Sequence, residues 1–254
     1  MSLFTQRYGT GDRSLVLLHG WGLNSQVWDF ILAPLSAHFT ITLVDLPGYG
    51  RSQPFPVLSL KDMAKEVAQI VPSQSVVVGW SLGGLVATQI ALECKDKVKQ
   101  LILVASSPCF IEKEAWPGIK PQVLDDFQLQ LATNFRRTIE RFIALQSLGT
   151  ANASLNTKTL KQAIIDQPQA SLAVLEQGLK ILQQSDLREN VANVDVPTLR
   201  IYGALDSLVP RRSMPQTDIL WPNSQSVVIE QAAHAPFISH PDRFCAEILK
   251  FIDE

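Results

Sequence analysis

The chain has 254 residues, of which 46% are hydrophobic and 18% are charged, and its formal net charge is −2. This composition suits one large domain with a substantial core and argues against bulk nucleic-acid binding. Its three cysteines are too few and too far apart for a disulfide framework or a metal cluster. The N-terminal segment lacks the apolar stretch of a signal peptide, and no apolar run approaches the ~20 residues of a membrane span. We therefore expect a cytoplasmic protein.

Strand and helix patterns alternate along the chain. Continuous apolar runs predict buried strands at residues 15–19, 40–45, 75–79, 98–105, 197–203 and 225–230. Helical spacing of apolar residues predicts helices at 26–37, 59–71, 82–94, 211–221 and 241–252. The alternation predicts an α/β fold with a mainly parallel sheet and helices on both faces.

One interval breaks this alternation. From residue 112 to residue 185 the pattern is helical, and no convincing strand interrupts it. The simplest interpretation is an all-helical lid, residues 112–185, inserted in a core formed by residues 1–111 and 186–254.

The stretch VVVGWSLGGLVA, residues 76–87, carries the strongest motif. Its valine run predicts a buried strand, the residues from Leu82 onward predict a helix, and Ser81 lies at the sharp turn between them. Glycines at 79 and 83 remove side chains that would clash in such a turn. This is the G-x-S-x-G nucleophile elbow, and it predicts that Ser81 is a nucleophile. The alternative is an ordinary serine in a glycine-rich turn.

A nucleophilic serine needs a histidine as its base, and the chain has four histidines. His234, in QAAHAPF, follows the last predicted strand, where this chemistry requires it. His240 stands beside a proline and is expected to begin the last helix, and His38 lies in a polar connection. His19 ends the first strong strand. We therefore expect His234 to be the catalytic base.

The carboxylate that orients this histidine should lie between serine and histidine in the chain. Asp206 follows the strand at 197–203, in the stretch YGALDSLVP. Asp45 also ends a strand, but it precedes Ser81, and we expect it to brace the turn through Gly48 and Gly50. We therefore predict that Asp206 completes the triad.

The tetrahedral intermediate of such a reaction needs two hydrogen-bond donors for its oxyanion. One is the backbone N–H of the residue after the nucleophile, which is Leu82. The other is expected from the loop HGWG, residues 19–22, where Trp21 is placed to supply its backbone N–H. The Trp21 side chain would then line the acyl pocket, although it could also serve only in packing.

A dinucleotide site is the main alternative from another class of function. The stretch GWGLNS, residues 20–25, follows a strand and partly resembles G-x-G-x-x-G, but Ser25 replaces the third glycine. The second candidate, Gly48-Tyr49-Gly50, has Gln53 in that place. The triad chemistry needs no cofactor, and we expect neither a cofactor nor a metal.

These motifs together resemble the α/β-hydrolase superfamily over essentially the full chain. More closely, the sequence resembles the family of pimeloyl-[acyl-carrier protein] methyl ester esterases of biotin synthesis. The closer resemblance rests on LLHGWGLNSQVW, VDLPGYGRS, GWSLGGLVATQIAL, VASSPCF, WPGIKP, RFIALQSLGT and AAHAPFISHP. The elbow and the HG motif belong to the whole superfamily, whereas SSPCF, WPGIKP and RFIALQ are typical of a narrower group within it.

The resemblance implies cleavage of the methyl ester of pimeloyl-carrier protein, with an acyl-carrier protein as partner. It places the family's catalytic residues on Ser81, Asp206 and His234. Its substrate contacts fall on Trp21, Ser81, Leu82, Phe142, Ile143, Ala144, Leu145, Gln146 and His234. We expect a monomer that binds neither nucleic acid nor membrane.

The segment around residue 140 suits such a substrate. Phe135, Ile139, Phe142 and Gln146 share one helical face, and Arg137 and Arg141 lie roughly opposite. Residues 136–161 carry an excess of four positive charges, with contributions from Arg136, Arg137, Arg141, Lys158 and Lys161. We expect Arg137, Arg141 and Lys158 to contact the acidic carrier; an ordinary solvated helix face is the alternative.

Other functions of the same fold stay open. The first is a generalist short-chain carboxylesterase, and a carbon–carbon-bond hydrolase would use the same triad. A haloalkane dehalogenase is disfavoured because it needs a carboxylate where Ser81 stands. A catalytically silent receptor of this fold is a further alternative, and the complete triad argues against it.

Overall fold

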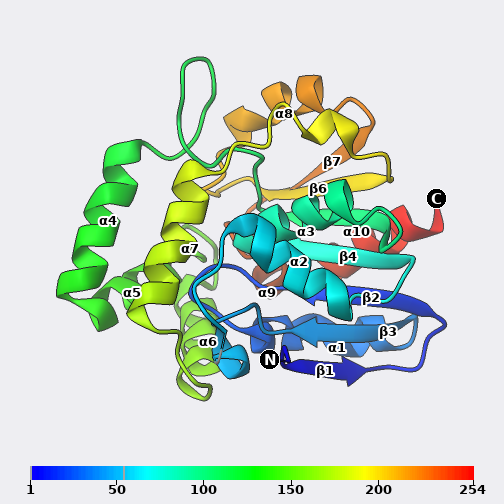
Figure 1. Cartoon of the computed structure of the whole chain (residues 1–254), viewed down its shortest axis with the longest axis horizontal. Coiled ribbons are helices and arrows are strands. Elements are labelled where there is room, and N and C mark those ends of the chain that lie inside the picture. Colours follow the sequence, from blue (N-terminus) through cyan, green and yellow to red (C-terminus); the bar gives the residue numbers. More distant parts are fainter. Residues whose placement is uncertain (1, 54) are drawn as a thin grey trace.

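A seven-stranded sheet with helices on both faces forms the body of the protein (Figure 1). The computed structural model describes residues 2–53 and 55–254, without the side chains of residues 135, 136, 159 and 163–165. The strand order is β1-β3-β2-β4-β5-β6-β7. The predicted α/β class and mainly parallel sheet are confirmed.

Six strands are parallel to one another and lie within one or two residues of the predicted ranges. They are β2 (Arg13–Leu18), β3 (Phe39–Val44), β4 (Ser75–Trp80), β5 (Val98–Val104), β6 (Thr198–Gly203) and β7 (Ser224–Ile229). The seventh, β1 (Thr5–Tyr8), pairs antiparallel with β3 and was not predicted. Its sequence TQRY is too polar for an apolar run, because this edge strand is only partly buried.

The two faces of the sheet bury separate cores, which explains why the strands are apolar throughout. Val16 and Leu18 of β2 belong to the core under α2 (Leu60–Ile70) and α3 (Leu82–Glu93). Leu15 and Leu17 of the same strand belong to the core under α1 (Asp29–Ser36) and α10 (Pro241–Asp253). Successive side chains of a strand point to opposite faces, so burial on both faces requires an uninterrupted apolar run.

Two predicted helices begin with a turn of 3₁₀-helix. Residues 25–28 are 3₁₀ before α1, and residues 211–213 are 3₁₀ before α8 (Met214–Leu220). The Asn24 side chain accepts a hydrogen bond from the Gln26 amide and so caps the first of these turns. A short helix, α9 (Pro236–Ser239), precedes α10.

Residues 112–185 lie between β5 and β6 and form what we call the helical insertion. It contains α4 (Pro121–Thr133), α5 (Phe135–Leu145), α6 (Ala153–Ile165) and α7 (Leu172–Gln184). Figure 1 shows these four helices gathered at one end of the sheet, on the left of the view. Helix begins only at residue 121, because residues 111–119 form a loop closed by isolated bridges and by a hydrogen bond from Trp116 Nε1 to the Cys109 carbonyl.

No helix in the described part of the chain is both long and apolar enough to cross a membrane. Among the described residues, no group of three or more His, Cys, Asp or Glu side chains is arranged to hold a metal ion.

Candidate active site

Ser81 occupies the turn between β4 and α3 in a backbone conformation that is rare for a residue with a side chain. Its φ is 54° and its ψ is −115°, so the turn stores strain of the kind found at functional sites. A Cβ at Gly79 would lie 2.3 Å from the Gly83 carbonyl oxygen, and one at Gly83 would lie 2.4 Å from the Leu18 carbonyl oxygen. Both glycines of the motif are therefore required by close backbone contacts.

Ser106, just beyond β5, holds the elbow from behind. Its hydroxyl donates to the Ser81 carbonyl oxygen at 2.9 Å, and the Ser81 amide donates to the Val104 carbonyl at 2.9 Å. Gly84 leaves room for Ser106, because a Cβ at Gly84 would lie 2.4 Å from the Ser106 Cβ. Sequence reasoning missed this role, since a serine after a strand belongs to no motif.

His234 and Asp206 form a buried pair. The two atoms Nδ1 of His234 and Oδ2 of Asp206 are 2.8 Å apart. The other carboxylate oxygen, Oδ1, accepts from the amides of Leu208 at 2.8 Å and Val209 at 3.0 Å. A carboxylate oxygen can only accept, so Nδ1 carries the proton and donates a hydrogen bond to Asp206. The other ring nitrogen, Nε2, then keeps its lone pair. Among the described residues, the buried Nε2 of His234 has no hydrogen-bond partner.

The three predicted triad residues lie at one edge of the sheet. Ser81 follows β4, Asp206 follows β6 and His234 follows β7, and carboxyl ends of parallel strands share an edge. A side-chain contact joins the elbow to the histidine loop, because Trp80 Nε1 donates to the His234 carbonyl at 2.7 Å. The geometry can therefore support nucleophilic catalysis, and the catalytic roles stay predictions.

The loop after β2 adjoins the elbow, as an oxyanion donor would require. A Cβ at Gly20 would lie 3.3 Å from the Ser81 Cβ and 3.1 Å from the Trp80 ring. Leu82 is the first residue of α3, and the first amides of a helix have no acceptor within the helix. The backbone N–H groups of Trp21 and Leu82 thus remain the candidates for the oxyanion.

An apolar cavity extends from Ser81 into the helical insertion. Apart from Ser81, every lining side chain is apolar: Phe110, Ile119, Val123, Leu124, Phe127, Phe142, Leu145, Leu179, Leu182 and Leu208. Most come from α4, α5 and α7. Those on α4 and α7 were not predicted, because apolar residues at helical spacing mark any buried helix face.

The predicted substrate run divides between several environments. Phe142 and Leu145 line the cavity, whereas Ile143 packs into the core on the α1 and α10 side. Ala144 is exposed. Gln146 is buried, and its side-chain amide donates to the Phe142 carbonyl. A helix turns its side chains in all directions, so five consecutive residues cannot all line one cavity.

Gln146 also ties the helical insertion to the histidine loop. Its carbonyl oxygen accepts a hydrogen bond of 3.2 Å from the amide of Ala235, the residue after His234. The end of α5 is therefore fixed directly beside the predicted base.

The Trp21 side chain lies one layer behind the cavity wall. It is fully buried, and its ring centroid is 4.8 Å from that of Phe142 and 5.6 Å from that of Phe127, both of which line the cavity. Its indole Nε1 donates to the Leu175 carbonyl on α7 at 2.9 Å. The expectation that this side chain lines the pocket needs correction: Trp21 supports two lining residues.

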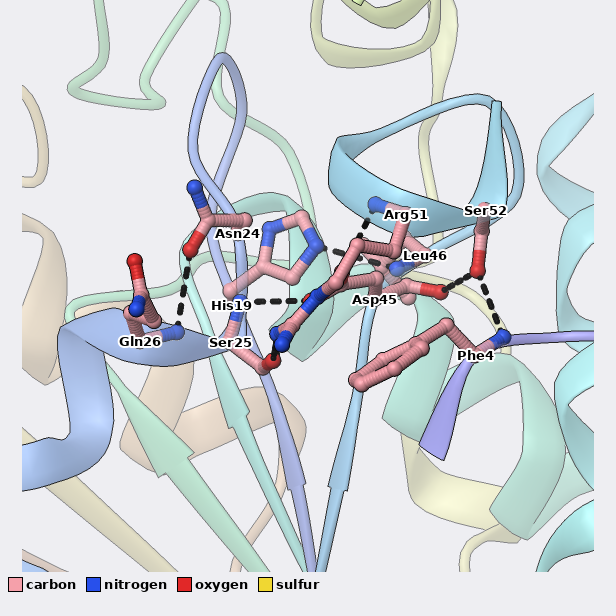
Figure 2. A network of polar contacts seen from close by, with 9 residues as sticks. All are labelled: Phe4, His19, Asn24, Ser25, Gln26, Asp45, Leu46, Arg51 and Ser52. Carbon is pink, nitrogen blue, oxygen red and sulfur yellow. Dashed lines mark hydrogen bonds and ion pairs between the residues drawn. The ribbon is translucent and has the colours of Figure 1, made fainter. Parts of the chain in front are cut away.

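A second histidine and a second aspartate lie at the same edge of the sheet (Figure 2). Asp45 accepts from the Ser25 amide, and from the amide and Nε of Arg51, each at 2.9 Å. His19 donates from Nδ1 to the Gly20 carbonyl at 2.8 Å, and its Nε2 accepts from the Leu46 amide at 2.9 Å. Asp45 therefore braces the turn of residues 45–51, and His19 joins that turn to the loop after β2.

Burial and neighbours shift the pKa of both groups. Burial lowers the pKa of His19 below its usual value and outweighs the opposing effect of the Asp45 charge. Burial alone would raise the pKa of Asp45, but the hydrogen bond from Arg51 and the other polar contacts lower it on balance. His19 is therefore neutral and Asp45 is ionised at neutral pH.

The predicted carrier contacts lie on the outside of the helical insertion. Arg137 and Lys158 are exposed. Arg141 is exposed too, and its guanidinium donates to Gln130 Oε1 on α4 at 2.6 Å. The side chains of Phe135 and Arg136, which also entered the prediction, lie outside the described residues.

Comparisons with known proteins identify the family. The family model described as the alpha/beta hydrolase fold matches residues 13–241. A pimeloyl-[acyl-carrier protein] methyl ester esterase of Pectobacterium carotovorum is 55% identical over 250 residues, which cover 98% of each chain. The esterase of that name from Citrobacter koseri is 54% identical, over 97% of this chain and 96% of its own.

Solved structures agree on the fold. An esterase from Exiguobacterium antarcticum superposes with a TM-score of 0.89 at 22% identity, over 99% of this chain and 96% of its own. A thermophilic esterase from Thermogutta terrifontis reaches a TM-score of 0.80 at 26% identity, over 99% of this chain and 93% of its own. The chain belongs to the α/β-hydrolase family.

Proposed function

We propose that the chain is a serine carboxylesterase that hydrolyses the methyl ester of pimeloyl-[acyl-carrier protein] in biotin synthesis. The observation that carries the chemistry is the buried His234–Asp206 pair, in which His234 Nε2 has no partner among the described residues. This pair lies at the same edge of the sheet as Ser81 with its strained backbone. The substrate is supported by the relatives of that name, which are more than half identical over nearly the whole chain.

The proposed reaction has two halves. His234 Nε2 accepts the Ser81 proton while Oγ bonds to the ester carbonyl carbon, and the N–H groups of Leu82 and Trp21 stabilise the oxyanion. The carbon–oxygen bond to the methoxy group breaks, and the methoxy oxygen takes the proton from His234 and leaves as methanol. Water then attacks the acyl-enzyme with the same base, which releases the carboxylic acid and restores Ser81. Asp206 holds the histidine tautomer throughout.

The cavity supports the proposed acyl chain. A pimeloyl chain is apolar between its two ends, and ten apolar side chains surround the space beside Ser81. Within the predicted run, we propose acyl contacts for Phe142 and Leu145, the two that line this space. The helical insertion supplies most of the wall, so we propose that it acts as the lid, with residues 1–111 and 186–254 as the catalytic core.

The exposed basic side chains of the helical insertion support a carrier-bound substrate. Arg137, Arg141 and Lys158 point to solvent on the insertion that forms the cavity wall. Exposed charges of this kind steer the encounter with an oppositely charged partner, and salt screens them. We propose that they attract an acidic acyl-carrier protein.

Complementation tests the substrate directly. In a strain blocked in pimeloyl ester cleavage, the wild-type chain should restore growth without biotin, and Ser81→Ala should not. A wild-type chain that hydrolyses small esters but fails to restore growth would favour the generalist carboxylesterase. A fluorophosphonate probe should label Ser81 in the wild type and no residue in Ser81→Ala; labelling of another serine would contradict the proposed nucleophile.

Charge reversal tests the carrier contact. Arg137→Glu with Arg141→Glu should lower kcat/KM for the carrier-bound methyl ester by about ten-fold at low salt, and leave a small free ester unchanged. Lys65→Glu with Lys99→Glu is the matched control, because both lysines are exposed and lie on α2 and at the amino end of β5. Equal losses on both substrates would mean that the arginines only stabilise the helical insertion.

A further inference from the structure

A glycine in the middle of α7 faces the loop that carries Trp21. Gly178 is the seventh residue of the helix Leu172–Gln184 and is buried. Glycine destabilises a helix interior relative to alanine, so a glycine there needs a reason in packing.

The reason is the close approach of two aromatic side chains. A Cβ at Gly178 would lie 2.3 Å from the Tyr49 hydroxyl oxygen, 2.5 Å from Trp21 Cδ1 and 2.9 Å from Trp21 Nε1. Both rings are fully buried, and the Tyr49 hydroxyl has no hydrogen-bond partner among the described residues. Alanine at position 178 would therefore displace one or both rings.

The same turn of α7 also binds the indole. Trp21 Nε1 donates to the Leu175 carbonyl, one turn before Gly178. The gap at Gly178 and the carbonyl of Leu175 together form a seat for the Trp21 ring, which we call the indole seat. Phe127 of α4 and Phe142 of α5 contact the other parts of the ring, so three helices of the insertion hold one side chain.

We infer that the indole seat positions the oxyanion loop: by holding the Trp21 ring, Gly178 and the Leu175 carbonyl fix where the Trp21 backbone N–H lies relative to Ser81. This inference rests on the proposed function. Gly178 is a positioning residue, since it acts through Trp21 and touches no reacting atom. The helical insertion then has a second role besides forming the acyl cavity, because displacement of α7 would also displace an oxyanion donor.

The loop after β2 contacts the helical insertion through the Trp21 indole. Gly20 and Gly22 flank Trp21 and carry no side chains, so the indole is the single side chain of residues 20–22 that packs against the rest of the molecule. The indole therefore ties this part of the loop to the helical insertion through Leu175, whereas His19 and Asp45 tie the ends of the loop to the turn of residues 45–51. An oxyanion donor acts only within hydrogen-bond distance of the developing charge, so a small displacement of the loop lowers the rate.

Gly178→Ala tests the inference with p-nitrophenyl acetate, whose acyl group is too short to need the cavity. We expect kcat to fall by about ten-fold or more, with KM within about three-fold, because the lost interaction forms only in the transition state. The inhibition constant of a short trifluoromethyl ketone, which forms a tetrahedral adduct with the serine, should rise by the same factor as kcat falls. Lys180→Ala, an exposed change on the same helix, is the matched control and should change neither quantity by more than about two-fold.

Two further variants locate the effect. Adding Tyr49→Phe to Gly178→Ala removes the closest clash and should recover at least about three-fold in kcat. Trp21→Phe keeps the backbone N–H and most of the ring but loses the bond to Leu175, and we expect kcat to fall by roughly three- to ten-fold. Trp21→Phe also tests the link if Gly178→Ala does not fold, which a thermal melt would reveal.

The results that would overturn the inference are distinct from those that would overturn the function. A folded Gly178→Ala with wild-type kcat and inhibitor affinity overturns the indole seat, as does a loss confined to KM or to long acyl esters. If Gly178→Ala does not fold, unchanged kcat in Trp21→Phe overturns it. A wild-type chain that hydrolyses no ester overturns the proposed function itself.

Discussion

Two histidines and two aspartates lie at the same edge of the sheet, and they differ in how their hydrogen-bonding groups are used. His234 and Asp206 follow β7 and β6, whereas His19 and Asp45 follow β2 and β3. All four side chains are buried. Burial and position at the edge of the sheet therefore do not distinguish the two regions.

The distinction lies in one nitrogen atom. Both ring nitrogens of His19 have backbone partners, and Asp45 is surrounded by donors from Ser25 and Arg51 (Figure 2). His234 donates from Nδ1 to Asp206, and its Nε2 has no partner among the described residues. A general base needs a ring nitrogen that is not already used in a structural hydrogen bond, and of the two histidines only His234 offers one. The first region holds loops together, and the second has the unpartnered ring nitrogen that the proposed base requires.

Asp206→Asn should produce the largest effect on activity. The asparagine amide would donate to His234 Nδ1 and so favour the wrong tautomer, and kcat should fall by about 10⁴-fold. The free energy of unfolding, measured by urea titration, should change by no more than about 1 kcal/mol, because an oxygen remains to accept from the Leu208 and Val209 amides. A large loss of stability with modest loss of kcat would reverse the assignment of the two regions.

Asp45→Asn should show the opposite pattern. Removing the buried charge leaves Arg51 without its partner, and the free energy of unfolding should fall by about 3 kcal/mol, at the low end for a buried pair because Arg51 is partly exposed. The kcat per folded molecule should stay within about three-fold of the wild type. Active-site titration with the fluorophosphonate probe gives the folded, competent fraction.

His19 should make folding sensitive to mild acid. Its pKa is lowered in the folded protein, chiefly by burial, so the unfolded chain takes up the proton first as the pH falls through about 6.5. Stability that is present above that pH is lost below it, by about 1–2 kcal/mol between pH 7 and pH 5. Protonation of Asp45 also lowers the free energy of unfolding, but at lower pH. Its stabilising contribution is present above about pH 3.8 and is lost as the pH falls further.

His19→Gln isolates this contribution. Urea titrations at pH 7, 6 and 5 should give a flatter pH dependence for His19→Gln than for the wild type. His38→Gln serves as the control, since His38 is exposed, and should keep the wild-type slope. Equal slopes for all three proteins would mean that His19 plays no part in the acid response.

Arg51→Lys should produce the smallest effect, a loss of about 1 kcal/mol in the free energy of unfolding. Lysine cannot reproduce the Nε bond to Asp45 together with the Nη2 bond to Ser25. It also loses the planar group that lies 3.6 Å from the Phe4 ring centroid. A loss as large as that of Asp45→Asn would mean that guanidinium geometry, and not charge, stabilises this region.

Much of the site could be predicted from local sequence. The valine run, the glycines of the elbow and the following helix pattern identify a strained strand-to-helix turn at Ser81, because each feature is a property of neighbouring residues. Chain order then distinguishes Asp206 from Asp45 as the predicted triad carboxylate, because only Asp206 lies between Ser81 and His234. The polar strand β1 and the 3₁₀ turns were missed, since they depend on pairing with β3 and on the Asn24 cap.

The sequence by itself determined the α/β class, the elbow and the residues able to form a triad, because alternation, glycine spacing and chain order are local or one-dimensional signals. Only the tertiary structure decided that Phe142 and Leu145 line the cavity while Ile143 packs elsewhere, that Ser106 supports the elbow, and that Gly178 seats Trp21. These relations join residues far apart in the chain across helix and strand faces. They depend on distances of a few ångströms, which no spacing in the sequence encodes.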